Sequence, residues 1–203
     1  MASLIVVYRL QRRGEVCNFP DTKIRCRRIC GMNWKNDPNL SAMSDEDYST
    51  QIIVHLTQEI ALHPNDKQAY FLRGNAYLDK RDFDAAIADY SRVIALAPSD
   101  AVAYNNRGIA FRSKGDPESA TEDYTRALAI NPDYRDAYNN LGLALSDLGA
   151  YAEAIRNYSR ALTLDPGYWY AYNNRGLALW AMGDKAAAMR DYEKVKELME
   201  NSW

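Results

Sequence analysis

The chain has 203 residues, of which 47% are hydrophobic and 26% are charged, and its formal net charge at neutral pH is −2. These proportions are typical of a folded globular protein and exclude a collagen-like or a wholly disordered chain. The apolar run at residues 4–8 is too short to cross a bilayer or to form a secretory signal, and the small net charge argues against a nucleic-acid-binding surface spread over the molecule.

The first 43 residues differ from the rest in charge and in cysteine content. They carry eight Lys and Arg against three Asp and Glu, a balance of +5, whereas residues 44–203 have a balance of −7. Cys17, Cys26 and Cys30 all lie in this segment, without the fourth ligand or the nearby histidine that a zinc site needs. We expect no metal site and a reducing, cytoplasmic location, with organelle import as the alternative.

The same segment has neither the periodicity of a helix nor that of a strand. We therefore expect residues 1–43 to form a disordered or poorly structured basic extension. Met43 lies just before a helical pattern, which makes a later start site the alternative, with the extension then outside the native protein. Mass spectrometry of the native N-terminus distinguishes these two interpretations.

One helix is predicted next, over residues 46–63. Its final residues and the proline after them, IALHP, are echoed by IALAP at residues 94–98, but no partner helix precedes it. We expect residues 44–64 to cap the array of repeats that follows, because a terminal repeat unit otherwise exposes its apolar face.

Residues 67–202 contain a repeat with a period of 34 residues. Proline recurs at this spacing, and the units run over residues 67–100, 101–134, 135–168 and 169–202. In each unit position 4 is Tyr, position 8 is Gly, position 20 is Ala and position 24 is Tyr. Side chains three and four residues apart share one face of a helix, so positions 4, 8 and 11 predict one amphipathic helix and positions 20, 24 and 27 a second.

A turn is predicted between the two helices of a unit. Gly115, Gly149 and Gly183 can supply the left-handed conformation that ends the first helix. Asp116 is predicted to cap the following helix, with Pro117 at its first position. The glycine at position 8 and the alanine at position 20 are expected to let the paired helices approach closely, while the tyrosines at positions 4 and 24 fill the space between successive pairs.

The period and the repeated positions resemble those of the tetratricopeptide repeat. The resemblance covers residues 67–202 and implies a repeat domain over residues 65–203. The implied fold is all-α: a right-handed α-solenoid of four helix-turn-helix units with an N-terminal capping helix. Modules of this family are protein-interaction scaffolds, so the resemblance also implies binding of another protein.

Position 7 departs from the leucine that is usual in the family. It is Arg73, Arg107 and Arg175 in three repeats, and these same repeats have Asp89, Asp123 and Asp191 at position 23. The third repeat has Leu141 and Asn157 at the two positions. This joint variation predicts an Arg–Asp ion pair between the two helices of one repeat.

No constellation of catalytic residues is found in the sequence. His55 and His63 lie near the predicted cap, and the glycines stand at repeat positions rather than in a phosphate-binding loop. The many Asp and Glu are interpreted as solvated helix faces and caps. The sequence therefore predicts that the protein is not an enzyme and has no cofactor.

A concave groove lined by the first helices, through positions 2, 5, 6, 9, 12 and 13, is implied by the resemblance. Asparagine recurs at positions 5 and 6, and its amide can both donate to and accept from the backbone of an extended peptide. The alternative is that these amides only solvate the groove. The candidate peptide-binding residues are Phe71, Asn75, Leu78, Asn105, Asn106, Arg112, Asn139, Asn140, Tyr170, Asn173, Asn174 and Trp180.

The predicted ligand of this groove is a neutral or apolar peptide segment. Relatives that capture the acidic tails of Hsp70 and Hsp90 use Lys and Arg where this chain has Phe71, Asp136 and Asn140. A carboxylate would gain no charge-assisted hydrogen bond there, so an acidic chaperone tail is not expected to bind. Aromatic and apolar side chains at both ends of the groove, among them Tyr170 and Trp180, are expected to act as anchors.

The function predicted from the sequence is that of an adaptor holding an extended or helical segment of another protein, with no nucleic acid or membrane as partner. The alternative is a structural assembly module that uses its ends or its convex face. At the C-terminal end Val195, Leu198, Met199 and Trp203 are expected to be partly exposed. This leaves open both a weak homo-oligomer formed through the C-terminal helix and a frayed terminal helix.

Overall fold

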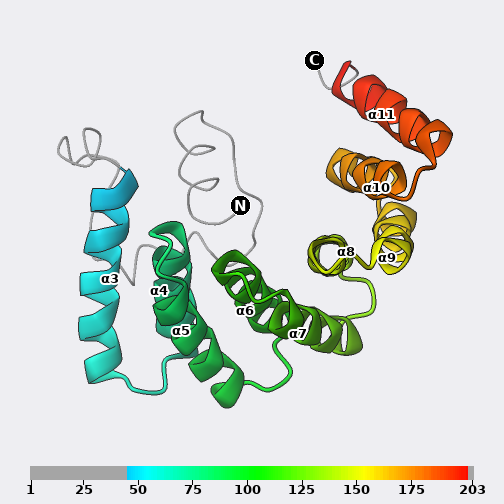
Figure 1. The fold of residues 1–203 in the computed structure, drawn as a ribbon. Helices are drawn as coiled ribbons and strands as arrows, with labels where there is room; N and C mark the ends of the chain where they lie inside the picture. The colour runs from blue at the N-terminus through cyan, green and yellow to red at the C-terminus, as the bar shows by residue number, and fades with distance from the viewer. Residues whose placement is uncertain (1–44, 201–203) are drawn as a thin grey trace. The chain divides into compact units, whose positions relative to one another are not determined.

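The computed structural model describes residues 45–200, and the regular secondary structure in this range is helical throughout (Figure 1). The all-α class predicted from the sequence is confirmed for this part of the chain. The predicted extension over residues 1–43 and Trp203 lie outside the described residues. The helices are α3 (Asp45–Leu62), α4 (Lys67–Asp79), α5 (Phe83–Leu96), α6 (Ala101–Lys114), α7 (Pro117–Ile130), α8 (Arg135–Asp147), α9 (Tyr151–Leu164), α10 (Trp169–Ala181) and α11 (Lys185–Glu200).

The chain divides into two compact units, with the boundary inside α5 between Arg92 and Val93. The first unit contains α3, α4 and most of α5, and α3 packs against α4. In the second unit each helix from α6 to α11 packs against the next, and the first helices of successive hairpins, α6, α8 and α10, also contact one another. None of the described helices combines the length and the apolar character needed to cross a membrane.

The helix ends follow the predicted signals. The side chain of Asp116 accepts a hydrogen bond from the Ser119 backbone N–H at 3.0 Å, and Pro117 is the first residue of α7. This hydrogen bond lowers the pKa of the Asp116 carboxyl. Gly115, Gly149 and Gly183 all have positive φ, at 94°, 76° and 89°, which confirms their predicted role in ending the first helices.

Arg81 occupies the same turn position in the first repeat and also has a positive φ, 63°. A residue with a Cβ atom is disfavoured in this conformation by about 1 kcal/mol relative to glycine. We therefore expect Arg81→Gly to raise the free energy of unfolding by about 0.5–1 kcal/mol, measured by urea denaturation followed by circular dichroism. Lys80→Gly is the matched control, because Lys80 has an ordinary φ of −77°. Equal stabilisation by both glycines would contradict the explanation.

The two helices of each hairpin meet where a tyrosine ring packs on a glycine. A Cβ atom added to Gly142 would lie 2.5 Å from Cε1 of Tyr158, and the corresponding distance from Gly74 to Tyr90 is 2.9 Å. The rings of Tyr90 and Tyr158 are at most 1% exposed. The close approach predicted from positions 8 and 24 is therefore confirmed. In α3, the equivalent of position 24 is Leu56, which is likewise buried.

The predicted Arg–Asp ion pairs are present in the three repeats that have both residues. Arg107 donates from Nε to Oδ2 of Asp123 at 2.7 Å and from Nη2 to Oδ1 at 2.8 Å. The pairs Arg73–Asp89 and Arg175–Asp191 have the same two-pronged geometry. Asp123 is almost completely buried, and each pair joins the two helices of one hairpin.

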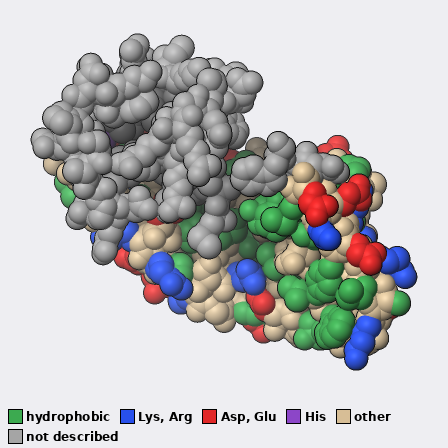
Figure 2. All heavy atoms as spheres, turned by 90° about the horizontal axis from the view of Figure 1, so that it is seen from above, with side chains coloured by type: hydrophobic (Ala, Val, Ile, Leu, Met, Phe, Trp, Pro, Cys, Tyr) green, Lys and Arg blue, Asp and Glu red, His purple; other side chains and the backbone are tan. Residues whose placement is uncertain are grey.

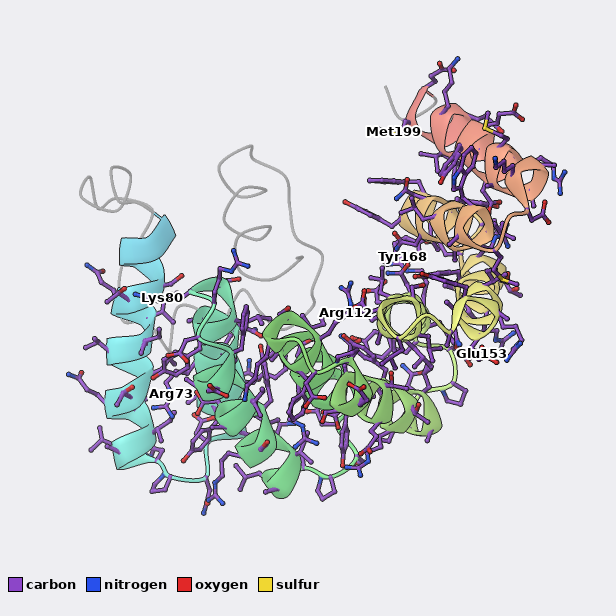
Figure 3. The ribbon with its side chains drawn as sticks, viewed as in Figure 1. Arg73, Lys80, Arg112, Glu153, Tyr168 and Met199 are labelled. Atoms are coloured by element: carbon purple, nitrogen blue, oxygen red, sulfur yellow. The ribbon has the colours of Figure 1, made fainter. Side chains whose placement is uncertain are left out.

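A third hydrogen bond from these arginines reaches the preceding helix. Nη1 of Arg175 donates to the Ser159 hydroxyl on α9 at 3.0 Å. Nη1 of Arg73 donates in the same way to the Thr57 hydroxyl on α3, also at 3.0 Å (Figure 3). The helix predicted to cap the array is thus attached to α4 by the same kind of bond that attaches α9 to α10.

Candidate functional site

The predicted binding residues of the second unit come from α6, α8 and α10, which contact one another in that order. We call the exposed and half-buried residues of these helices at positions 2, 6, 9, 12 and 13 the first-helix face. Its members are Val102, Asn106, Ile109, Arg112, Ser113, Asp136, Asn140, Leu143, Ser146, Asp147, Tyr170, Asn174, Leu177, Trp180 and Ala181.

Asparagines of neighbouring repeats are hydrogen bonded to one another across this face. Nδ2 of Asn140 donates to Oδ1 of Asn105 at 3.0 Å, and Nδ2 of Asn174 donates to Oδ1 of Asn139 at 2.9 Å. Asn105 and Asn139, both at position 5, are only 3% and 5% exposed. The asparagine pattern in the sequence predicts that these two amides contact a ligand. The structure instead buries them, because they accept the bonds that join one repeat to the next.

The position-6 asparagines of the second unit remain half-buried and so reach the solvent. They are Asn106, Asn140 and Asn174. Asn106 accepts a hydrogen bond from Nδ2 of Asn105 at 3.2 Å, within its own helix. Asn173 is half-buried as well, unlike its equivalents in the two preceding repeats.

In the first unit, Asn75 is buried and accepts a hydrogen bond from the Tyr90 hydroxyl at 2.6 Å. This again differs from the expectation of a ligand-facing amide, because the bond joins α4 to α5 inside the hairpin. Phe71 is half-buried with its ring edge-on to that of Tyr90, at 5.9 Å between centroids. Leu78 is also half-buried.

Arg112, the basic residue predicted for the site, is bound to Asp147 at the end of α8. Its Nε lies 2.6 Å from Oδ2 of Asp147, and its Nη2 donates to Oδ1 at 3.3 Å (Figure 3). Both side chains are more than a third exposed, so this pair contributes little to stability. Because Asp147 balances its charge, Arg112 adds no net positive charge to the first-helix face.

Three large apolar side chains are exposed on α10. Tyr170 is 52% exposed, Leu177 58% and Trp180 48%, and their spacing places them on one side of the helix. The ring of Tyr170 stacks on that of Trp169 at 3.7 Å, and Nζ of Lys185 lies 5.3 Å from the Trp180 ring centroid. On the right of Figure 2, the side on which α10 and α11 lie in Figure 1, hydrophobic side chains are grouped and charged ones stand around them.

A cluster around Arg135 was missed by the sequence analysis. Its guanidinium bonds to Asp136 at 2.7 Å and to Asp165 at 2.6 Å, and it lies 4.1 Å from the Tyr168 ring centroid. A shallow depression here is lined by Asp133, Tyr134, Arg135, Asp136, Leu164 and Asp165.

The tyrosine hydroxyls of this cluster do not titrate near neutral pH. Burial raises the pKa of Tyr134 to about 12, and it also raises the pKa of Tyr168. Both hydroxyls therefore stay protonated at neutral pH. Among residues 45–200, no group of three or more His, Cys, Asp or Glu side chains is arranged to hold a metal ion.

The sequence matches family profiles described as TPR repeat or tetratricopeptide repeat over residues 72–139, 123–156, 142–183 and 170–201. A crystal structure of MamA is 26% identical, with 79% of this chain and 97% of that chain covered and a TM-score of 0.70. The first TPR of Spaghetti (RPAP3), bound to the HSP90 peptide SRMEEVD, is 28% identical, with 58% and 93% covered and a TM-score of 0.56. A comparison with curated proteins finds no match.

YrrB, described as a TPR protein with an unusual peptide-binding site, has a TM-score of 0.64 at 18% identity, with 75% of this chain and 78% of that chain covered. At that identity the likeness concerns the fold alone. The profile matches extend over residues 72–201, and these structural neighbours confirm the α-solenoid fold class predicted from the sequence. The chain belongs to the tetratricopeptide-repeat family.

Proposed function

We propose that the protein is a non-catalytic scaffold that binds an extended, uncharged segment of another protein on the first-helix face. Membership of the tetratricopeptide-repeat family supports the general role in protein interaction. The observation that carries the specific proposal is the row of half-buried amides at position 6, which ends beside the exposed side chains of Tyr170, Leu177 and Trp180.

The position-6 amides are suited to a peptide backbone. Asn140 and Asn174 each use one N–H in the bond to the preceding repeat, and that bond fixes the orientation of the amide. An asparagine side chain has a second N–H and a carbonyl oxygen, which are the groups that match a backbone C=O and N–H. Beside these amides, position 9 carries Ile109, Leu143 and Leu177, which offer contact to apolar side chains.

The charges on the face disfavour an acidic ligand. Asp136 and Asp147 are both on it, and Arg112 and Arg135 are already bound to carboxylates. The peptide SRMEEVD held by RPAP3 ends in three acidic residues out of four, so on this face it would meet charges of its own sign. We therefore infer that the partner segment is neutral or apolar, with burial of the Tyr170 and Trp180 rings as the main source of affinity.

Selection from a random peptide library with the full chain as bait tests this proposal. We expect selected peptides to be rich in apolar residues and poor in Asp and Glu. The double change Tyr170→Ala and Trp180→Ala is expected to weaken their binding at least about tenfold, measured by fluorescence anisotropy. Ile130→Ala is the matched control, because Ile130 is an exposed apolar residue at the end of α7, away from this face.

Unchanged affinity in the double variant, or tight binding of the peptide SRMEEVD, would contradict the proposal. Substitution of the asparagines is a poorer test. Asn140→Ala would leave the buried oxygen of Asn105 without its donor, so any loss of binding could come from altered stacking of the repeats.

A further inference from the structure

The outer face of α11 carries apolar side chains that are exposed in the described part of the chain. We call this surface, made of Lys185, Met189, Tyr192, Lys196, Met199 and Glu200, the α11 face. Met189 is 49% and Met199 50% exposed, and Tyr192 is half-buried. The residues recur at intervals of three and four, so they share one side of the helix. Figure 3 labels Met199, near the end of α11.

The equivalent surfaces of α7 and α9 are covered by the next hairpin. Tyr124 on α7 packs with Leu141 and Ala144 of α8, and Tyr158 on α9 packs with Ala178 of α10. Both tyrosines are 1% exposed. The α11 face is thus the stacking surface of the fourth hairpin, with its tyrosine in the same place.

The rim of the α11 face is unsuited to a further hairpin of the same kind. Lys196 stands where α9 has Leu162, which is 6% exposed under the following hairpin, and the Lys196 side chain is 77% exposed. Lys185 stands where α9 has Tyr151. A further hairpin that covered Lys185 and Lys196 as Leu162 is covered would bury two ammonium groups. Their loss of hydration would carry a large free-energy cost.

The first residue of α11 is a cation and its last is an anion, while Asp184 just before the helix caps it by accepting a hydrogen bond from the Ala187 N–H at 3.0 Å. The helix begins at Lys185 and ends at Glu200, whereas α7 and α9 have an acidic residue, Glu118 and Glu153, in the first turn. A cation at the start and an anion at the end of a helix are both disfavoured by the helix macrodipole. Glu200 is within 3.8 Å of Lys196, but both side chains are at least 67% exposed, so this pair compensates little.

We propose that the α11 face binds the α11 face of a second copy of this chain, with the two helices antiparallel. A two-fold axis near the two Tyr192 residues places Lys185 of each copy beside Glu200 of the other copy. It also brings Met189 and Met199 of the two copies under cover, and each helix end then lies near a charge of favourable sign. The lysines stay at the rim, in contact with water.

The association is expected to be weak, because one helix of 16 residues is about 24 Å long and offers a small surface. Small interfaces of this kind belong to transient complexes, and we expect a dissociation constant on the order of 100 µM. The proposal does not rest on peptide binding to the first-helix face, although Lys185 also contacts that face, with its Nζ 5.3 Å from the Trp180 ring centroid.

Sedimentation equilibrium of the full chain, from about 10 µM to about 1 mM, tests the proposal. The wild-type chain is expected to pass from monomer to dimer over this range. Met189→Lys with Met199→Lys should weaken association at least about tenfold, because four further ammonium groups would then lie near Lys185 and Lys196 of the two copies. Ile130→Lys places the same charge on an exposed apolar position of α7 and should leave association unchanged.

A charge exchange tests the antiparallel arrangement. Lys185→Glu and Glu200→Lys should each weaken association about threefold or more, and the two changes together should restore it, because only the exchanged pair again has opposite signs. A monomer at every concentration overturns the proposal, as does association that survives the double methionine variant. Association that is lost in Tyr170→Ala/Trp180→Ala but kept in the α11 variants also overturns it. Peptide binding measured on the double methionine variant, which leaves Lys185 and Trp180 unchanged, keeps this outcome separate from that of the proposed function.

Discussion

The double variant Arg107→Leu/Asp123→Asn is expected to unfold at a higher urea concentration than either single variant. Each single change leaves one member of a buried ion pair without its partner, because Asp123 is 2% exposed and the Arg107 side chain 15%. Breaking such a pair by removal of one partner costs about 3–5 kcal/mol, mostly as the solvation free energy of the charge left behind. The double change removes both charges and should restore most of that loss.

The third repeat already has the two residue types that the double change would introduce. Leu141 stands at the arginine position and is 8% exposed, and Asn157 stands at the aspartate position. Nδ2 of Asn157 donates to the backbone oxygen of Glu153 at 2.9 Å, so the amide finds a partner in its own helix. A hairpin of this protein therefore folds with leucine and asparagine at these two positions.

A second cycle on Arg112 and Asp147 provides the control. The shortest N···O distance of this pair, 2.6 Å, is close to the 2.7 Å between Arg107 and Asp123, but its side chains are 35% and 43% exposed. Its coupling energy should stay below about 1 kcal/mol, whereas that of Arg107 and Asp123 should be at least about 2 kcal/mol. Additive losses at Arg107 and Asp123 would contradict the assignment of the pair as a buried, mutually dependent unit.

Most of the helices, turns and contacts that were predicted correctly from the sequence lie within a single repeat. The Gly142–Tyr158 contact and the Arg107–Asp123 pair join positions 16 residues apart in one hairpin, and they recur in other repeats at the same spacing. Repetition shows which positions vary together, and helix geometry shows which of them share a face. Together they predict the helices, the turns at Gly115, Gly149 and Gly183, and the Gly–Tyr and Arg–Asp contacts within hairpins. They do not predict the Asn75–Tyr90 hydrogen bond in the first hairpin.

The packing of the position-24 tyrosines between successive hairpins was predicted, but the hydrogen bonds between the asparagines of neighbouring repeats were not. Asn105 and Asn140 stand 35 residues apart, and whether their amides meet depends on the rotation and translation from one repeat to the next. A pattern of residue types does not specify these quantities. A signal was nevertheless present, because asparagine occupies positions 5 and 6 together in three successive repeats. Such a double row can join neighbouring repeats as well as bind a ligand.

The Arg135 cluster and the backbone of Arg81 illustrate a second limit. Arg135 occurs at the first position of one repeat, so no recurrence marks it. Its partner Asp136 is the next residue in α8, but its partner Asp165 lies at the end of α9. Arg81 adopts positive φ because it follows the turn geometry of Gly115, Gly149 and Gly183. Here the geometry of the turn overrides the preference of the residue.

Gly142→Ala is expected to lower the free energy of unfolding by about 2 kcal/mol, although alanine favours a helix over glycine by up to about 1 kcal/mol. The added Cβ atom would lie 2.5 Å from Cε1 of Tyr158, whose ring is 1% exposed and packed with Ala154 and Ala178. The Tyr158 hydroxyl also shares a 3.2 Å hydrogen bond with Ser146, so the ring cannot turn away without losing it. Gly74→Ala, at 2.9 Å from the Tyr90 ring, should cost less.

Combining Gly142→Ala with two different substitutions of Tyr158 distinguishes steric overlap with the ring from any other effect of the new methyl group. In a Tyr158→Phe background the ring carbon remains, so the loss on urea denaturation should persist. In a Tyr158→Leu background the ring carbon is absent, as at Leu56 of α3, and the alanine should be neutral or stabilising. A loss of the same size in the leucine background would mean that the glycine is needed for its backbone and not for the space it leaves. The tyrosine at position 24 would then not be the reason for glycine at position 8.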